Sequence, residues 1–137
     1  MMQPQIHTTF AGECLADAAG RMRDHGAASL VVVDGGHRPV GVVTERDLLR
    51  AMADGLPPRR TPVSACMTAE PVTVTPETDI RETAMLMLAH GIRQLPVVER
   101  GVTVGMVSAR DLLLLQAWPA PEPSRQARAR WSRRLTP

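Results

Sequence analysis

Two short segments of the chain carry a spacing of side chains that can hold a phosphorylated sugar. Each has a hydroxyl residue followed by arginine and aspartate: Thr44, Arg46 and Asp47 in the first, and Ser108, Arg110 and Asp111 in the second. At a helix start, the hydroxyl can cap free backbone N–H groups and donate to a phosphate oxygen, and the positive end of the dipole favours the anion. The aspartate can accept hydrogen bonds from vicinal ribose hydroxyls, and the arginine can pair with phosphate in bidentate geometry.

The same spacing is also an ordinary helix cap. A threonine or serine followed three residues later by an acid satisfies the first backbone N–H groups of a helix without any ligand. The pattern alone therefore leaves both interpretations open, a structural cap and a binding site.

Both segments belong to an internal repeat. A shift of 65 places residues 6–34 on 71–99, and after a one-residue gap the shift becomes 64. The matching pairs are Thr8/Thr73, Ala19/Ala84, Met22/Met87, His25-Gly26/His90-Gly91, Leu30/Leu95, Val32/Val97, Val33/Val98, Val40-Gly41/Val104-Gly105, Val43/Val107 and 46–49/110–113. Because the matches keep their order and fall in the same local patterns, we expect two copies of one folding unit.

Each copy is predicted to run strand, helix, strand, strand, helix. In the second copy, the β-branched residues 71–74 predict a strand. Thr75 is the expected N-cap of the following helix, with Pro76 at its first position. That helix is expected to bury Ile80, Ala84, Met87 and Leu88 and to end at His90-Gly91, where glycine suits the left-handed conformation.

A hairpin and a short helix complete each copy. Strands at 95–98 and 102–107 are expected to pair around Glu99-Arg100-Gly101, and Ser108 caps a helix that runs to Leu115. The first copy repeats this order. Its expected elements are a weaker opening strand at 6–10, a helix carrying Leu15, Ala19 and Met22, strands at 31–33 and 40–43, and a helix that follows the Thr44 cap and runs through Asp47 to Met52.

The predicted organisation is residues 1–56 as the first copy, 57–66 as a linker, 67–117 as the second copy, and 118–137 as a Pro- and Arg-rich tail. One unit of about 50 residues buries only a marginal core. We therefore expect an α/β (α+β) fold in which the two sheets pack face to face, with a pseudo-two-fold axis between the copies.

Composition narrows the class of protein. All 16 basic residues are arginines, and five of them lie in the tail against one glutamate, so residues 118–137 carry +4 and residues 1–117 carry −2. The body therefore lacks the basic surface of a nucleic-acid-binding domain. Cys14 and Cys66 do not make a disulfide framework, and no apolar run approaches the ~20 residues of a membrane span. With no signal peptide expected at residues 1–10, the predicted location is the cytoplasm, with no membrane association.

The repeat resembles a tandem cystathionine-β-synthase (CBS) domain pair, often called a Bateman module. The resemblance covers residues 6–117 and is carried by Gly-Val-Val-Thr-Glu-Arg-Asp-Leu at 41–48, Gly-Met-Val-Ser-Ala-Arg-Asp-Leu at 105–112, and Met-Thr-Ala-Glu-Pro-Val-Thr-Val-Thr-Pro at 67–76. It implies a disc-like homodimer with clefts between the sheets. In this family, such clefts bind adenosine-containing ligands such as AMP, ADP, ATP, NAD or S-adenosylmethionine.

The resemblance also extends the set of site residues. By analogy with the family, Thr73 and Pro96 would line the adenine in the second cleft, and Arg93 would reach the phosphates. The ligand-binding residues expected from the pattern and the resemblance are Thr44, Arg46, Asp47, Thr73, Arg93, Pro96, Ser108, Arg110 and Asp111. Residues 9–12 of the first copy depart from the Val-Thr-Pro-Glu of the second, so binding is expected at one cleft or both, with the second cleft favoured.

These observations predict a stand-alone regulatory module that senses an adenine nucleotide or related ligand and modulates a partner protein. No catalytic motif, metal site or required cofactor is expected, because no nucleophile–base pair, phosphate-binding loop or paired Cys-x-x-Cys occurs. The two cysteines are expected to be inert, and His25 and His90 to serve at helix ends. The alternative is a ligand-free dimer whose basic tail binds an acidic protein or nucleic acid.

Overall fold

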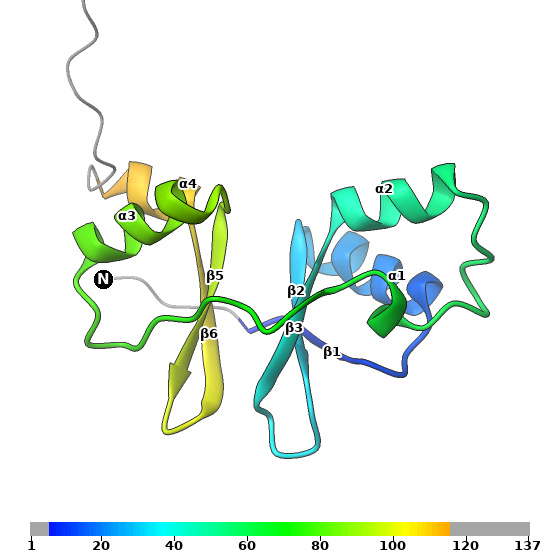
Figure 1. The fold of residues 1–137 in the computed structure, drawn as a ribbon, viewed down its shortest axis with the longest axis horizontal. Helices are drawn as coiled ribbons and strands as arrows, with labels where there is room; N and C mark the ends of the chain where they lie inside the picture. The colour runs from blue at the N-terminus through cyan, green and yellow to red at the C-terminus, as the bar shows by residue number, and fades with distance from the viewer. Residues whose placement is uncertain (1–5, 116–137) are drawn as a thin grey trace, which may run out of the picture.

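Residues 6–115 are described by the computed structural model as two similar units. The first consists of β1 (Thr8–Phe10), α1 (Leu15–His25), β2 (Ser29–Val33), β3 (Pro39–Thr44) and α2 (Glu45–Ala53). A 3-10 turn, η1 (Val63–Ala65), precedes β4 (Thr68–Ala69), α3 (Ile80–His90), β5 (Gln94–Glu99), β6 (Val102–Ser108) and α4 (Ala109–Leu114). Figure 1 shows the two hairpins β2–β3 and β5–β6 side by side, with α1 and α2 outside one and α3 and α4 outside the other.

The two sheets are connected through the chain that joins the copies. In the first, β1 runs parallel to β2, and β3 lies antiparallel to both β2 and β4. In the second, β5 and β6 are antiparallel, and Val74 adds a parallel bridge to Val97. Because β4 follows the linker yet pairs with β3, the chain that leads into the second copy extends the sheet of the first.

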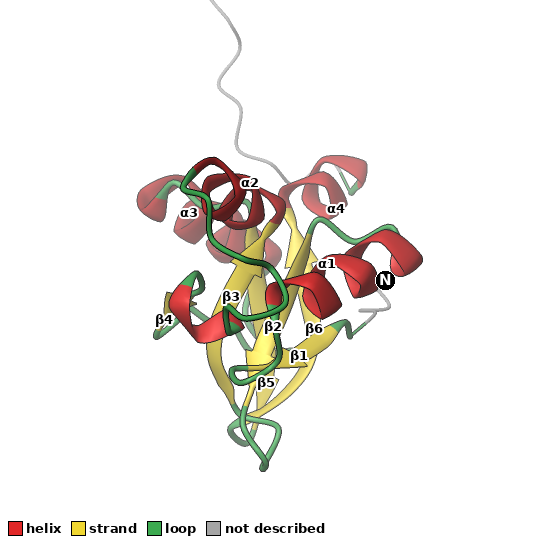
Figure 2. Cartoon of the chain, turned by 90° about the vertical axis from the view of Figure 1, so that its right-hand side faces the viewer, coloured by secondary structure: helices red, strands yellow, loops and turns green. Residues whose placement is uncertain are grey.

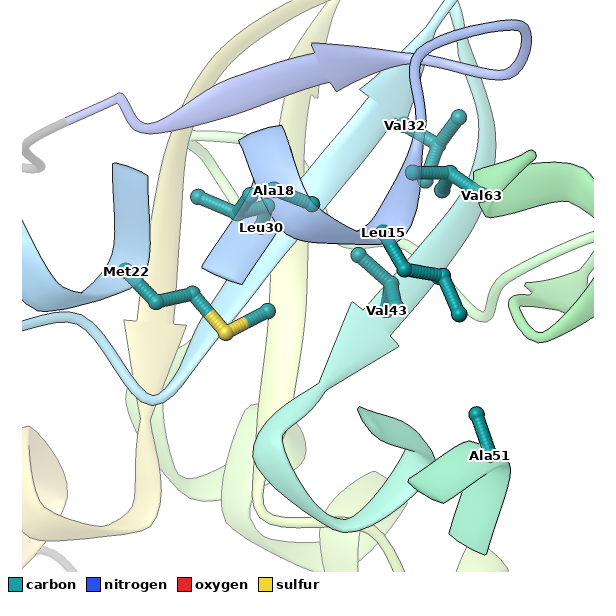
Figure 3. Packing of buried hydrophobic residues seen from close by; sticks show 8 residues of the cluster. All are labelled: Leu15, Ala18, Met22, Leu30, Val32, Val43, Ala51 and Val63. Atoms are coloured by element: carbon teal, nitrogen blue, oxygen red, sulfur yellow. The ribbon is translucent and has the colours of Figure 1, made fainter. Parts of the chain in front are cut away.

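Each unit has its own core on the outer face of its sheet. In the first, α1 packs Leu15, Ala18 and Met22 over Leu30, Val32 and Val43 of the hairpin, as Figure 3 shows. In the second, Ala84 and Met87 of α3 cover Leu95 and Val107. The alternation of these positions along the strands follows from the two-residue period of a β-strand.

The inner faces of the sheets are buried as well. All five residues of β2 are buried, and Val31 and Val33, which alternate with the residues facing α1, are no more than 1% exposed. Backbone contact between the halves includes a hydrogen bond of 2.9 Å from the Thr103 N–H to the His37 carbonyl. The predicted α+β class, with two repeats packed sheet to sheet, is confirmed.

Helix ends and turns follow the local sequence closely. Gly26 and Gly91 end α1 and α3 in the left-handed conformation, with φ of 62° and 64°. Arg100 and Gly101 both have positive φ, 53° and 81°, which is the geometry of a two-residue hairpin turn that matches strand twist. Figure 2 shows the hairpin turns at the end of the molecule opposite α2 and α4.

The predicted start of the third helix was wrong. Thr75 does not cap a helix: its carbonyl accepts the N–H of Thr78, and its own N–H donates to the Thr78 hydroxyl at 3.0 Å. These bonds close a turn over residues 75–78, which includes Pro76. The helix begins at Ile80, after Asp79 accepts the N–H of Arg81 at 3.2 Å.

Two further expectations for the second copy also differ. Residues 71–74 form no extended strand, because within this stretch Val74 alone makes a bridge to the sheet. Ile80 and Leu88 are 36% and 48% exposed, so they do not join Ala84 and Met87 in the core. The four-residue spacing predicted that they lie on the buried face. The orientation of α3 about its axis instead turns Thr83, Ala84 and Met87 inward.

Part of the predicted linker, residues 57–66, is bound to the first copy. The Thr61 carbonyl accepts the N–H of Leu15, and the N–H of Val63 donates to the Glu13 carbonyl at 2.8 Å. Val63 is fully buried in the first core. Residues 61–67 therefore fold onto the first copy before the chain enters the second.

The close passage of Met67 over Gly41 yields a prediction about stability. A Cβ added at Gly41 would lie 2.5 Å from Met67 Sδ and 3.0 Å from the Thr68 carbonyl oxygen. Gly41→Ala should lower the free energy of unfolding by about 1–3 kcal/mol, the usual effect of overpacking, as measured by urea denaturation. Gly35→Ala is the matched control, since nothing lies within 4 Å of its added Cβ, and it should lose no stability. Equal stability of the two variants would contradict the packing of β4 on β3.

Candidate functional site

The first candidate site lies where β3 ends and α2 begins. Thr44 and Asp47 form a reciprocal capping box: the Thr44 hydroxyl accepts the N–H of Asp47 at 3.2 Å, and Asp47 Oδ2 accepts the N–H of Thr44 at 2.8 Å. The Thr44 hydroxyl also donates to Asp47 Oδ2 at 3.0 Å. Both side chains are half-buried, so the cap is partly shielded from water.

The second candidate site repeats this arrangement where β6 ends and α4 begins. The Ser108 hydroxyl accepts the N–H of Asp111 at 3.1 Å, and Asp111 Oδ2 accepts the N–H of Ser108 at 2.9 Å. No acceptor for the Ser108 hydroxyl hydrogen occurs among residues 6–115. Over the same range, Oδ1 of Asp47 and of Asp111 takes no hydrogen bond, so each carboxylate keeps one oxygen that can accept from a ligand hydroxyl.

The structure brings Arg93 next to the second capping box. The Arg93 carbonyl accepts the N–H of Ala109 at 2.8 Å, and the adjacent Gln94 pairs with Ser108 across the hairpin. The guanidinium belongs to an exposed residue beside the start of α4. An arginine at this place can meet an anion held by Ser108.

Thr73 and Pro96 lie together on the inner face of the second sheet. The N–H of Val74 donates to the Pro96 carbonyl at 3.0 Å, which holds the two segments side by side. Val74 and Leu95 belong to the outer core, so their neighbours Thr73 and Pro96 face the other way, toward the first sheet. Thr73 is exposed and Pro96 is buried.

Arg46 and Arg110 occupy the first turns of α2 and α4, and both are exposed. No ion pair involves either of them within the part of the chain that the structure describes. Each guanidinium is therefore available to an anion near the adjacent cap.

Two titratable groups near the first site have shifted pKa values. Burial raises the pKa of the Cys66 thiol, and the carboxylates of Asp47 and Asp54 raise it further. Burial also lowers the pKa of His7, and the neighbouring His25 adds to that effect. The His7 and His25 rings are stacked, with centroids 4.5 Å apart.

Some features of these sites were not predicted from the sequence. The His7–His25 stack joins the segment before β1 to the end of α1, a contact that no local pattern indicates. The difference in charged residues between the two copies can be read from the sequence, because the repeat places Ala28 at the position of Arg93 and Glu45 at that of Ala109. A residue-by-residue comparison of the two copies carries that signal.

Three further expectations concern metal binding, membrane association and the tail. Within residues 6–115, no group of three or more His, Cys, Asp or Glu side chains is placed to hold a metal ion. Over that same range, no helix is long and apolar enough to cross a membrane. The predicted Arg-rich tail, residues 118–137, lies outside the described residues.

Comparison with known proteins identifies the repeat. The CBS domain family matches residues 1–54 and 63–117, one match for each copy. An uncharacterised 17.7 kDa protein of Acidianus ambivalens is 38% identical over 109 residues, which is 79% of this chain and 65% of that protein.

Solved structures agree with this identification. A protein with CBS domains from Burkholderia ambifaria matches with a TM-score of 0.75 at 31% identity, covering 88% of this chain and 90% of that one. A CBS domain protein from Pyrobaculum aerophilum, solved as a complex with AMP, matches with a TM-score of 0.76 at 30% identity, covering 85% and 93%.

The burial of His7, to which the neighbouring His25 adds, predicts how stability depends on pH. The pKa of His7 is lowered in the native state from the ordinary histidine value of about 6.5. Below that pH, the unfolded chain therefore binds a proton more readily than the native chain. The His7 contribution should therefore be constant above that pH, and stability should fall as the pH drops through the interval below it. His7→Val, which installs the residue found at Val72 in the second copy, should reduce this loss. Thermal melts at pH 8 and pH 5.5 test it, and equal losses in the two proteins would contradict the assignment.

Proposed function

This chain belongs to the CBS domain family, and from that membership we propose that it is a regulatory module that senses an adenosine-containing ligand. The ligand class is AMP, ADP, ATP, NAD or S-adenosylmethionine. The observation that carries the proposal is the second capping box, which retains Asp111 Oδ1 and the Ser108 hydroxyl hydrogen beside the exposed Arg93. The AMP complex of the Pyrobaculum aerophilum protein supports the choice of ligand.

Each residue has a stated part in this proposal. Asp111 Oδ1 accepts from the ribose hydroxyls, and Ser108, Arg93 and Arg110 hold the phosphate by hydrogen bonds and charge. Thr73 and Pro96 contact the adenine from the inner face of the sheet. Thr44, Arg46 and Asp47 occupy the corresponding positions in the first copy, where Asp47 Oδ1 accepts from the ribose hydroxyls.

Sensing requires that the ligand prefer one arrangement of the two sheets over another. The hairpins are joined near their turns by the bond between Thr103 and His37, at the end opposite the candidate sites. A ligand held where α2 and α4 begin therefore changes the angle between the sheets about that contact. A partner protein reads the changed surface, and the module itself catalyses no reaction.

The proposed assembly is a homodimer in the cytoplasm. Apolar residues are exposed on α2 and α4, among them Leu49 at 66%, Met52 at 72%, Leu113 at 58% and Leu114 at 75%. Clusters of exposed apolar side chains commonly mark contact surfaces, and a second copy of this chain presents the same surface in return.

Ligand binding is tested by titrating AMP, ATP, NAD and S-adenosylmethionine and following the melting temperature. A ligand present at 100 times its Kd should stabilise the protein by about 2.7 kcal/mol. Asp111→Asn keeps an oxygen to accept the Ser108 N–H but replaces a ribose acceptor by an amide donor, so the fold should remain while stabilisation by AMP or ATP disappears. The proposal fails when none of the four compounds shifts the melting temperature of the parent protein.

The dimer is tested by sedimentation. Leu49→Glu combined with Met52→Glu places charges on the exposed face of α2 and should convert the protein to monomers. Val102→Glu is the control, because Val102 is also exposed, at 37%, but lies near the hairpin turn. A double variant that sediments like the parent protein would show that α2 does not form the interface.

A further inference from the structure

The two candidate sites have the same backbone but different charges. The carbonyl of Ala28 accepts the N–H of Glu45 at 3.0 Å, just as the carbonyl of Arg93 accepts the N–H of Ala109 at 2.8 Å. Ala28 and Arg93 are thus structurally equivalent, and so are Glu45 and Ala109. The first copy has a methyl group where the second has a guanidinium, and a carboxylate where the second has a methyl group.

These exchanges reverse the net charge of the site. Around the first capping box lie Glu45, Arg46 and Asp47, two carboxylates and one guanidinium, for a net −1. Around the second lie Arg93, Arg110 and Asp111, two guanidinium groups and one carboxylate, for a net +1.

Other nearby groups do not cancel this difference. Arg50 lies one turn beyond Asp47 on α2 and adds a positive charge there, but it forms no ion pair with Asp47 among residues 6–115, and with it counted the first site is still less positive than the second. His7, which precedes β1 of the first copy, has a lowered pKa and is therefore neutral at pH 7. The Cys66 thiol has a raised pKa, due first to burial and then to Asp47 and Asp54, which agrees with a negative surrounding.

The hydroxyl groups of Thr44 and Ser108 also differ, in a way that favours a phosphate at the second site. The Thr44 hydroxyl donates its hydrogen to Asp47 Oδ2 at 3.0 Å, whereas no acceptor for the Ser108 hydrogen occurs within residues 6–115. A phosphate at the second site thus meets an available donor and two guanidinium groups. At the first site, it meets the Glu45 carboxylate and a hydroxyl that already has an acceptor.

We propose that the two sites select ligands by charge: the second copy takes a phosphorylated nucleotide, and the first takes a ribonucleoside without a phosphate. The inference rests on the proposed function, because it assumes that Asp47 and Asp111 each hold a ribose. Oδ1 of Asp47 can accept from a ribose as Oδ1 of Asp111 can. Ala28 with Glu45, and Arg93 with Ala109, are the residues that determine specificity.

Calorimetric titration with AMP and with adenosine separates the two sites. Asp111→Asn should abolish AMP binding and leave adenosine binding, while Asp47→Asn should do the reverse. Each site should prefer its own ligand by at least about tenfold, the ratio that corresponds to 1.4 kcal/mol. Two AMP sites of similar affinity in the parent protein would overturn the inference and leave the proposed function standing. If neither compound binds to the parent protein, both fail.

Substitutions that exchange the charged residues between the two copies provide the second test. Ala28→Arg combined with Glu45→Ala gives the first site the charges of the second, and AMP stoichiometry should rise from one to two per chain. Ala53→Arg, which adds a positive charge at the far end of α2, should leave it at one. Arg93→Ala, at an exposed position, removes one of the two guanidinium groups of the second site and should weaken AMP binding at least about tenfold, which corresponds to 1.4 kcal/mol, at unchanged adenosine affinity. A folded Ala28→Arg/Glu45→Ala protein that still binds one AMP would contradict the proposal.

Discussion

The structure depends on the burial of β2 from both sides. Leu30 and Val32 face α1 on one side, while Val31 and Val33 are buried on the other, where the second sheet lies. A single copy would expose the second pair of valines and retain a core of marginal size. Packing of the two sheets is therefore a condition for the stability of each copy, and it fixes the pseudo-two-fold relation from which the position of the sites follows.

That relation makes the same few atoms serve both folding and binding. Each hairpin ends at a hydroxyl residue, and the next helix is capped by that hydroxyl and by one oxygen of an aspartate. The cap uses Oδ2 and the hydroxyl lone pair, while Oδ1 is left free within the described residues. A structural cap and a ligand contact are thus compatible interpretations of the same side chains, and the sequence pattern could not choose between them because both require the same spacing.

Local chemistry predicted much of the fold, and non-local contacts account for the errors. The glycine helix ends, the two hairpins and the two caps follow from residues within one turn of each other, and all were predicted correctly. The predicted start of α3 was wrong because a threonine can either cap a helix or close a local turn. Thr75 closes a turn with Thr78. The exposure of Leu88 and the stacking of His7 on His25 depend on how elements pack, which the spacing of residues does not specify. The positions of Arg93, Thr73 and Pro96 came from the family resemblance, and their ligand contacts remain predictions.

The divergence of the two sites has a physical explanation in the backbone. At positions 28 and 93, the carbonyl group holds the start of the next helix, and at positions 45 and 109, the N–H group does so. The side chains at positions 28, 45 and 93 are exposed and take no part in these bonds. Folding therefore constrains the main chain at these four positions but leaves the charge nearly free at 28, 45 and 93, whereas Ala109 packs against the second core, so each copy can carry a different charge beside a similar cap. Specificity between two sites of one repeat can thus change without any change in the architecture that positions them.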